Sequence, residues 1–336
     1  MKAERILMAH GSGGLMSQQL IDEVFKTAWR NEYLETMLDG ALLDLPAGRV
    51  AMSTDSFVIT PIFFPGGDIG KLSICGTVND LAACGALPLY LSVAMIIEEG
   101  LPLADLHRIA ESMAQTAVQA GVKLVTGDTK VVEKGSADGI FINTTGIGLI
   151  PEDIDYRPQR IREGDHIIVT GTVGDHGLSI LAQREGLRFS TPVISDCAPL
   201  NAIGRKLAPY KADIRCMRDP TRGGLATVLN EIAAQSNLGI IVRDNDIPVS
   251  PVVRGACDML GMDPLYMANE GKMVIFTAPE KSAAVLKTLH GIPESRAAAI
   301  IGELRAQPAG LVLIETELGA ERILGPLEGE HVPRIC

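Results

Sequence analysis

Three aspartates that follow apolar runs are the residues of this sequence best suited to chemistry. They are Asp55 in MSTDSF, Asp80 in GTVND and Asp128 in VTGDTKV. Ligands of α/β proteins gather at the carboxyl ends of strands, and Mg²⁺ is usually held by one or two carboxylates together with substrate phosphates. A single aspartate also favours turns and helix caps for purely structural reasons. The three together, each beside a Thr, Asn or Gly, predict a magnesium site.

Two glycine-rich stretches offer backbone N–H groups to an anion. Residues 10–14, HGSGG, could form a nest of successive N–H groups, and residues 218–224, RDPTRGG, are typical of a helix start that faces a phosphate. A flexible loop and a plain helix N-cap are the structural alternatives, and both stay open. Neither GxxxxGK(S/T) nor GxGxxG occurs in the sequence, so the motifs exclude a P-loop NTPase and a Rossmann dehydrogenase.

Lys130 and Glu270 carry the next groups of interest. Lys130 follows Asp128 by two residues on an expected strand, so both side chains point to one side. Glu270 lies within NEGK, where another strand is expected to start. Each has an ordinary structural alternative, because a lysine near carboxylates usually forms an ion pair and a glutamate at a strand start is usually solvated.

The last residue of the sequence, Cys336 in PRIC, is a different kind of candidate. Chain ends lie at the surface, and the neighbouring α-carboxylate should raise the pKa of the thiol and weaken it as a nucleophile. Cys336 is therefore either incidental or a handle that another site must activate. The other cysteines show no CxxC spacing, which argues against a disulfide framework or a zinc site. We expect these to be buried packing residues: Cys75, Cys84, Cys197, Cys216 and Cys257.

An alternation of apolar strands and amphipathic helices must position these residues. The 336 residues suggest two domains, at about 150 residues per domain, and a hydrophobic content of 46% predicts well-buried cores. Asp55 and Asp128 are expected on or next to strands, and Asp80 on a helix. We expect an α/β domain over residues 1–158, an α+β domain over residues 159–318 and a flexible tail over residues 319–336.

The net charge limits the partners that we expect, and the distribution of apolar residues limits the location. A net charge of −11 disfavours nucleic acid and anionic membranes, and no basic stretch with aromatic residues offsets it. The N-terminal residues lack the apolar core of a signal peptide, and no apolar run of about 18 residues occurs. We therefore expect a cytoplasmic protein with reduced thiols and without nucleic-acid or membrane partners.

The motifs taken together resemble the HypE family of hydrogenase maturation factors. They are HGSGG, STDSF, FFPGGDIGKL, CGTVNDLAACGA, VTGDTKVV, RDPTRGG, ANEGK and PRIC, and they extend from His10 to Cys336. That family is a branch of the aminoimidazole ribonucleotide synthetase-like ATP-binding superfamily, beside selenophosphate synthetase and thiamine monophosphate kinase. The aspartate motifs mark the superfamily, and the terminal PRIC points to the HypE branch.

The resemblance implies a fold and a nucleotide site. An N-terminal α/β domain would join its strands to those of a second subunit in a β-barrel, and a C-terminal α+β domain would follow. ATP with Mg²⁺ would lie in a cleft near the interface of this homodimer. The residues matched to nucleotide binding are Asp55, Lys71, Thr77, Asn79, Asp80, Asp128, Thr129 and Asn143. Those matched to the metal are Asp55, Asp80 and Asp128.

The resemblance also implies a reaction, an ATP-dependent carbamoyl dehydration. The carbamoyltransferase HypF would place a carbamoyl group on Cys336, which is then dehydrated to a thiocyanate. The cyanide would pass to iron on a HypC–HypD scaffold and become a ligand of the [NiFe]-hydrogenase active site. The residues matched to catalysis are Cys336, Glu270 and Lys130. Either Glu270 or Lys130 would be the base.

Three other functions remain to be weighed. A selenophosphate synthetase of the same superfamily would carry a reactive cysteine or selenocysteine in its glycine loop, and AHGSGG has neither; a small-molecule kinase is the related alternative. A non-enzymatic iron or nickel chaperone with a thiol tail would favour clustered Cys and His ligands. The sequence shows no such cluster.

Overall fold

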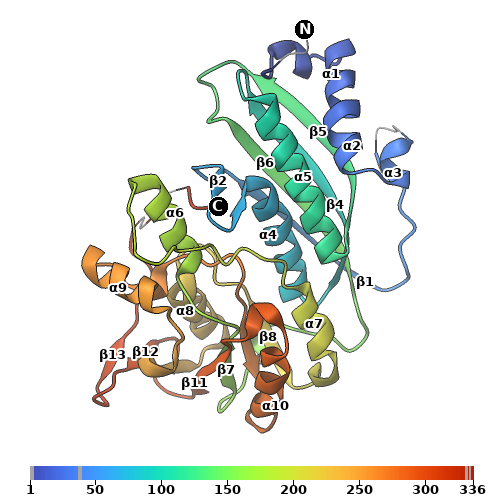
Figure 1. The fold of residues 1–336 in the computed structure, drawn as a ribbon. Coiled ribbons are helices and arrows are strands. Elements are labelled where there is room, and N and C mark those ends of the chain that lie inside the picture. Colours follow the sequence, from blue (N-terminus) through green and yellow to red (C-terminus); the bar gives the residue numbers. More distant parts are fainter. Residues whose placement is uncertain (1–3, 37–39, 330–331, 333) are drawn as a thin grey trace.

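The computed structural model describes residues 4–36, 40–329, 332 and 334–336. Two β-sheets lie in different halves of the molecule (Figure 1). The N-terminal sheet has four strands in the order β1-β6-β4-β5, in which β4 and β5 are parallel and the other neighbours antiparallel. Its strands are β1 (Arg49–Phe57), β4 (Leu87–Glu98), β5 (Lys123–Val132) and β6 (Ile140–Ile150). A two-stranded ribbon, β2 (Phe63–Phe64) with β3 (Gly67–Asp68), precedes the first long helix.

Two helices cover one face of this sheet (Figure 1). α4 (Ile69–Ala83) is buried on nearly every side, and α5 (Leu103–Ala120) buries one apolar stripe. The side chain of Asp68 caps α4 by accepting hydrogen bonds from the N–H groups of Gly70 (2.7 Å) and Lys71 (3.0 Å). α5 ends at Gly121, whose φ of 72° only glycine adopts at low cost. These signals place both helices where the apolar spacing predicts them.

The N-terminal segments lie beside β5. They are η1 (Met8–Gly11), α1 (Leu15–Leu20), η2 (Ile21–Phe25), α2 (Lys26–Ala28) and α3 (Glu32–Glu35). Trp29 anchors them, because its indole N–H donates to the main-chain oxygen of Ala110 in α5 at 2.9 Å. Asn31 caps α3 and also donates to the oxygen of Leu124 in β5 at 2.7 Å. The segments therefore form a cover over the β5 side of the sheet.

The opposite face of the N-terminal sheet carries no helix among the described residues. Met52 in β1 is 72% exposed there, and Val50 and Ile96 are also exposed. Exposed apolar residues gathered on one face of a sheet are typical of a surface that binds a partner.

The C-terminal sheet has seven strands in the order β13-β12-β9-β11-β7-β10-β8. The strands are β7 (His166–Val169), β8 (Ile214–Arg218), β9 (Gly239–Arg243), β10 (Val274–Thr277), β11 (Ala299–Arg305), β12 (Val312–Glu315) and β13 (Glu321–Ile323). The helices are α6 (Asp175–Glu185), α7 (Asn201–Leu207), α8 (Gly224–Ser236), α9 (Pro251–Leu260) and α10 (Pro279–His290). The short helical turns are η3 (Pro158–Arg160), η4 (Ala208–Tyr210), η5 (Asp244–Asp246), η6 (Pro264–Tyr266) and η7 (Pro293–Ser295).

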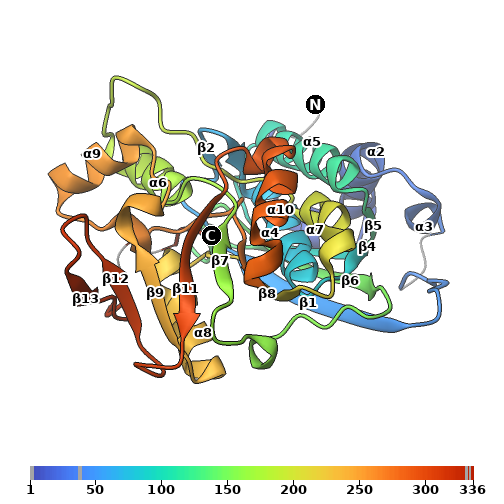
Figure 2. The ribbon, with the colours of Figure 1, turned by 90° about the horizontal axis from the view of Figure 1, so that it is seen from below.

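Both faces of this second sheet are covered (Figure 2). In β10, Val274 and Phe276 pack with α8, whereas Ile275 packs with α7 and α10. Strands buried on both faces are continuously apolar, which is the pattern of VIF in β10. Among the described residues, no helix combines the length and the hydropathy that a membrane crossing requires.

Asn79 of α4 connects the two halves. Its amide N–H₂ donates to the main-chain oxygens of Ala198 (3.1 Å) and Glu270 (3.3 Å), and its oxygen accepts from the N–H of Leu200 (2.7 Å). The predicted two-domain α/β plus α+β fold is confirmed. The sheet extends into residues 319–336, because β13 pairs with β12 and Leu324 is fully buried; the domain boundaries themselves stay predictions.

Candidate functional site

A cleft of about 660 Å³ lies between the two halves and collects ionisable groups. β1 and α4 form one wall, and the turn between β8 and α8 forms another. The last residue of the chain reaches into it. The lining residues that carry its chemistry are Asp55, Asp80, Asp219, Arg222, Glu270 and Cys336.

Asp55 and Asp80 face each other from β1 and α4. Gly76 permits this approach, since a Cβ at Gly76 would lie 2.8 Å from the ring of Phe57 and 3.4 Å from Oδ2 of Asp55. The hydroxyl of Ser53 donates to Oδ2 of Asp80 and orients it. Burial raises the pKa of both carboxyls, and Asp80 raises that of Asp55 further by repulsion.

Asp219 and Glu270 add two more carboxyls. Burial, followed by the charge of Asp80, raises the pKa of Asp219 to about 7. Glu270 is 3% exposed, and its Oε1 is buried without a hydrogen-bond partner among the residues that the structure describes. Burial is the largest cause that raises the pKa of Glu270 well above its ordinary value, and the charges of Cys197 and Asp219 add to it. A buried acceptor without a donor is costly unless a ligand or reactant completes it.

Cys336 enters the same cleft at the end of an ordered segment. Burial is the main cause that raises the pKa of its thiol to about 12, followed by the charge of Glu270. At neutral pH the docked sulfur is therefore a thiol and a poor nucleophile. The N–H of Val58 donates to the main-chain oxygen of Cys336 (3.1 Å), and that of Thr60 to the oxygen of Arg334 (3.4 Å).

Side chains also hold this segment. Nε of Arg334 donates to the oxygen of Val58 at 3.0 Å, and Nη1 of Arg334 pairs with Asp138. Nε2 of His176 lies 2.8 Å from the main-chain oxygen of Ile335, which is itself buried. Pro333 of the PRIC motif lies outside the described residues.

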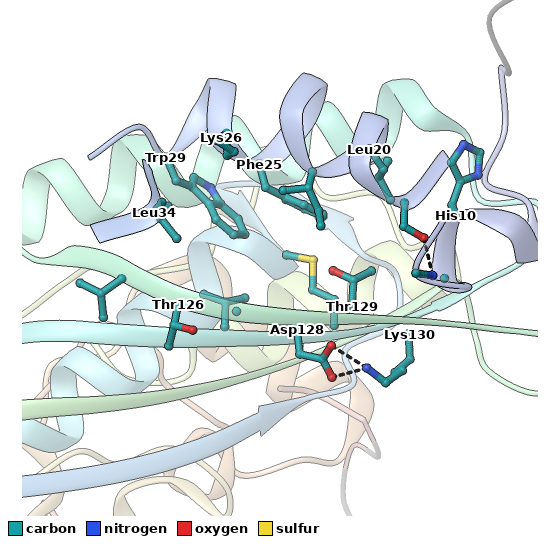
Figure 3. A pocket seen from close by; sticks show the side chains of 18 of the residues that line it. His10, Leu20, Phe25, Lys26, Trp29, Leu34, Thr126, Asp128, Thr129 and Lys130 are labelled. Carbon is teal, nitrogen blue, oxygen red and sulfur yellow. Dashed lines mark hydrogen bonds and ion pairs between the residues drawn. The ribbon is translucent and has the colours of Figure 1, made fainter. Parts of the chain in front are cut away.

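Asp128, Thr129 and Lys130 line a second cavity, of about 320 Å³, between β5 and the N-terminal segments (Figure 3). Gly11 and Gly13 of HGSGG also line it. Asp128 and Lys130 form an ion pair, whose hydrogen bond is the largest cause of the lowered pKa of Asp128. In Figure 3 both side chains point away from the helices, whereas Thr129 points toward them.

The strand register shows why Asp128 does not join the other two aspartates. Asp55 pairs through Thr144 and Val93 with Gly127, so one row of the sheet places Gly127 opposite Asp55. The row crosses three strand spacings, roughly 14 Å. Asp128 is the next residue and lies on the other face, because side chains alternate along a strand. Within the part of the chain that the structure describes, no three Asp, Glu, His or Cys residues could hold a metal ion together.

The other residues matched to nucleotide binding have structural partners. Nζ of Lys71 donates to the oxygen of Gly66 (2.8 Å), and the Thr77 hydroxyl lies 2.6 Å from that of Thr144. Asn79 joins the two halves as described above. The amide of Asn143 donates to the oxygen of Asp55 at 2.9 Å. None of these four is among the described residues that line either cavity: Lys71, Thr77, Asn79 and Asn143.

Comparisons with known proteins agree with the motifs. Residues 38–150 match the N-terminal domain of the family described as AIR synthase related protein, and residues 162–314 match its C-terminal domain. Carbamoyl dehydratase HypE of Azotobacter vinelandii is 50% identical over 98% of this chain and 96% of its own length. That of Escherichia coli K12 is 46% identical over 98% and 99%. The chain belongs to the HypE family.

Solved HypE structures share the fold described above. A HypE crystallised in complex with ATP has 49% identity and a TM-score of 0.95, over 98% of this chain and 99% of that one. A HypE–HypF complex has 47% identity and a TM-score of 0.82, over 92% and 99%. A thiamine-monophosphate kinase of Stenotrophomonas maltophilia, at 20% identity and a TM-score of 0.66, shares the fold alone. The resemblance to the HypE family is confirmed, and the alternative functions are not favoured.

Sequence reasoning overlooked Asp219, Arg222 and His176, and it was wrong about the burial of one cysteine. The two interpretations of RDPTRGG, a phosphate-facing helix start and a plain helix N-cap, give no role to Asp219 as a buried acid or to Arg222 as a cation at the cleft. No role was assigned to His176, which contacts the tail. Cys84 was expected to be buried but is exposed, because α4 ends there and the cleft opens beside it. Only a DP turn before a glycine pair hinted at Asp219, and nothing local marked His176.

Proposed function

We propose that this chain dehydrates a carbamoyl group carried on Cys336 to a thiocyanate, with ATP as the phosphoryl donor. The observation that carries the proposal is the placement of Cys336 in a cleft with the buried carboxyl of Glu270, whose Oε1 has no hydrogen-bond partner within the described part of the chain. Membership of the HypE family supports it. The product would supply the cyanide ligand of the iron in [NiFe]-hydrogenase maturation.

Dehydration requires a good leaving group for the carbamoyl oxygen. We propose that this oxygen attacks the γ-phosphorus of ATP, so that an O–P bond forms as the bond to ADP breaks. A base then removes the N–H protons while the C–O bond breaks and a C≡N bond forms. The oxygen and the two protons end in inorganic phosphate, and sulfur keeps the carbon. Atoms and charges balance without an oxidant or a reductant.

Glu270 is the base that we assign. It shares the cleft with Cys336, whereas Lys130 lies on the opposite face of the N-terminal sheet of the same chain. A raised pKa makes the Glu270 carboxylate a stronger base once it has lost its proton. Arg222 lies in the same cleft and favours the ionised forms of Asp55 and Asp80.

The residues present fit a magnesium ion. Asp55 and Asp80 offer hard oxygen ligands that repel one another when both are ionised, and one or two carboxylates suffice when phosphates supply further ligands. When bound, Mg²⁺ would neutralise charge on the transferring phosphoryl group. The second cavity offers a place for the part of ATP beyond its phosphates. It is lined by Thr129, by glycines of HGSGG and by the apolar ring of Trp29.

A homodimer would complete this site. β1 and β5 are the two edges of the N-terminal sheet, and edge strands invite pairing. In a barrel made from two such sheets, β1 of one chain would pair with β5 of the other. β5 also carries Asp128, Thr129 and Lys130, so this pairing would bring that strand of the partner subunit next to β1 and Asp55. The exposed Met52 would be covered.

The proposed partners follow from the same chemistry. HypF would load the carbamoyl group on Cys336, which is supported by the solved HypE–HypF complex. The HypC–HypD scaffold would accept the cyanide. Both steps require the Cys336 segment to leave the cleft. The cytoplasmic location stays a prediction.

Glu270→Gln tests the assignment of the base. Intact mass spectrometry of the chain after incubation with HypF, carbamoyl phosphate and ATP should show the carbamoyl adduct for both proteins. Only the wild type should then lose one water. Normal water loss by Glu270→Gln would refute the role of Glu270, and the absence of any adduct on Cys336 in the wild type would refute the proposed function.

A further inference from the structure

The segment Ser195–Asp196 lies between α6 and α7, and Ser195 and the side chain of Asp196 are buried between the tail and the Glu270 carboxyl. The N–H of Ser195 donates to the oxygen of Pro65 at 2.9 Å, which fixes the segment against the loop between β2 and β3. Its two side chains point to different parts of the site. Each holds a group that the proposed reaction requires in a defined place.

Ser195 is connected to the tail by hydrogen bonds through His176. Nδ1 of His176 lies 2.7 Å from the Ser195 hydroxyl, and Nε2 lies 2.8 Å from the oxygen of Ile335. A carbonyl oxygen only accepts, so Nε2 carries the hydrogen and Nδ1 accepts from Ser195. The Ser195 oxygen in turn accepts from the N–H of Cys197 at 3.1 Å. Both ring nitrogens of His176 and the hydroxyl of Ser195 therefore have hydrogen-bond partners.

Asp196 binds the main chain at Glu270. Its carboxylate accepts from the N–H of Glu270 (3.0 Å) and from that of Gly271 (3.2 Å), and it pairs with Lys272 at 3.1 Å. Gly271 packs tightly on the same segment, because a Cβ there would lie 1.8 Å from the main-chain oxygen of Asp196. The backbone from which the Glu270 side chain extends is therefore held from one side.

We propose that Ser195–Asp196 is a positioning element that couples the docked tail to Glu270, with His176 as its contact to the tail. The inference rests on the proposed function, in which Cys336 must reach Glu270 and later leave. The hydrogen bond to Ile335 sets how far Cys336, the next residue, enters the cleft. When the tail leaves, the buried Nε2–H loses its acceptor, so departure is costly and return is favoured.

The test separates docking from catalysis. Docking is measured without ATP or carbamoyl group, as the rate at which N-ethylmaleimide labels Cys336, with the site assigned by peptide mass spectrometry. Catalysis is measured as the rate of water loss from the chain loaded by HypF. His176→Phe keeps a ring beside Phe64 but removes both hydrogen bonds. His176→Gln keeps a donor close to the position of Nε2.

His176→Phe should raise the labelling rate of Cys336 about tenfold, equivalent to about 1.4 kcal/mol. It should slow water loss by a similar factor and leave loading by HypF unchanged, and His176→Gln should restore most of both rates. His290→Phe is the matched control: its Nε2 also bonds to a carbonyl, that of Ala298, but it does not line the cleft. It should change neither rate.

Unchanged labelling by His176→Phe would overturn the tail contact, and faster labelling with unchanged water loss would overturn the coupling. If His176→Phe fails to fold, Ser195→Ala provides a second test, because it removes the hydrogen bond to Nδ1 of the same imidazole. Ser195→Ala should raise the labelling rate of Cys336 and lower the rate of water loss, each about threefold. Unchanged rates in that variant would also refute the proposal. A wild-type chain that never loses water would refute the proposed function, while labelling would still decide the tail contact.

Discussion

Ionisation of Cys336 should release the tail at high pH. Burial raises the pKa of the docked thiol to about 12, whereas a free cysteine has a pKa of about 8.5. A group whose pKa is raised in the docked state contributes fully below the lower value and loses its contribution above it. Docking should therefore be constant below about pH 8.5 and weaken about tenfold per pH unit above it.

At pH 10 the difference amounts to about 30-fold in the docking constant, or about 2 kcal/mol. Besides burial, the charges of Glu270, Asp55 and Asp219 raise the pKa of the docked Cys336. The charge of Arg222 lowers it. Cys336→Ser removes the ionisable thiol and keeps a side chain of similar size. The variant should dock independently of this titration.

Hydrogen exchange of two amides measures docking directly. The N–H groups of Val58 and Thr60 donate to the oxygens of Cys336 and Arg334, so their protection reports the docked tail. Between pH 8 and 10, protection in the wild type should fall about 30-fold relative to Cys336→Ser. Equal protection in both proteins across this range would refute the reasoning, because it would mean that the thiol does not ionise differently in the two states.

Three further predictions concern the dimer, the catalytic loop and the core. Met52→Glu, which places a charge on the open face of the sheet, should yield a monomer in sedimentation velocity where the wild type is a dimer; a dimeric variant would contradict the barrel. Gly271→Ala should abolish water loss, since its Cβ would overlap the oxygen of Asp196, and an active variant would show that the loop tolerates displacement. Leu72→Ala, at a fully buried position in α4, should cost about 2–5 kcal/mol in a denaturant titration; a cost below about 1 kcal/mol would contradict the packing of α4.

Local sequence signals were sufficient for most of the fold. The helix of α5 follows from its apolar stripe and from Gly121, whose φ is positive as a C-terminal cap requires. α4 was also predicted, from its i, i+3, i+4 apolar spacing and from Gly85 as a stop, although it is buried on nearly all sides. β13 was missed: a three-residue edge strand has little pattern of its own and depends on pairing with β12.

The candidate site was predictable in composition but not in geometry. Motifs identified Asp55, Asp80 and Glu270, which do share one cleft. They also grouped Asp128 with them, although alternation along β5 turns its side chain to the other face of the sheet. The face of a strand follows from register and pairing, which are long-range properties that spacing along one segment does not contain.

His176 illustrates a second limit of sequence reasoning. Its role depends on two partners, Ser195 and Ile335, of which Ile335 is 159 residues away in the sequence. A buried histidine whose two ring nitrogens both form hydrogen bonds has no local sequence signature, because its partners come from other segments. Here they are a side-chain hydroxyl and a main-chain oxygen. Such residues are found only when the fold brings distant segments together.

The fate of the carbamoyl oxygen tests the central claim most directly. The chain is loaded on Cys336 with a carbamoyl group that carries ¹⁸O and is incubated with ATP in unlabelled water for a single turnover. Transfer of that oxygen to the γ-phosphorus predicts one ¹⁸O atom in each inorganic phosphate released, together with a thiocyanate on Cys336. Release of the ¹⁸O as water, with unlabelled phosphate, would contradict the account.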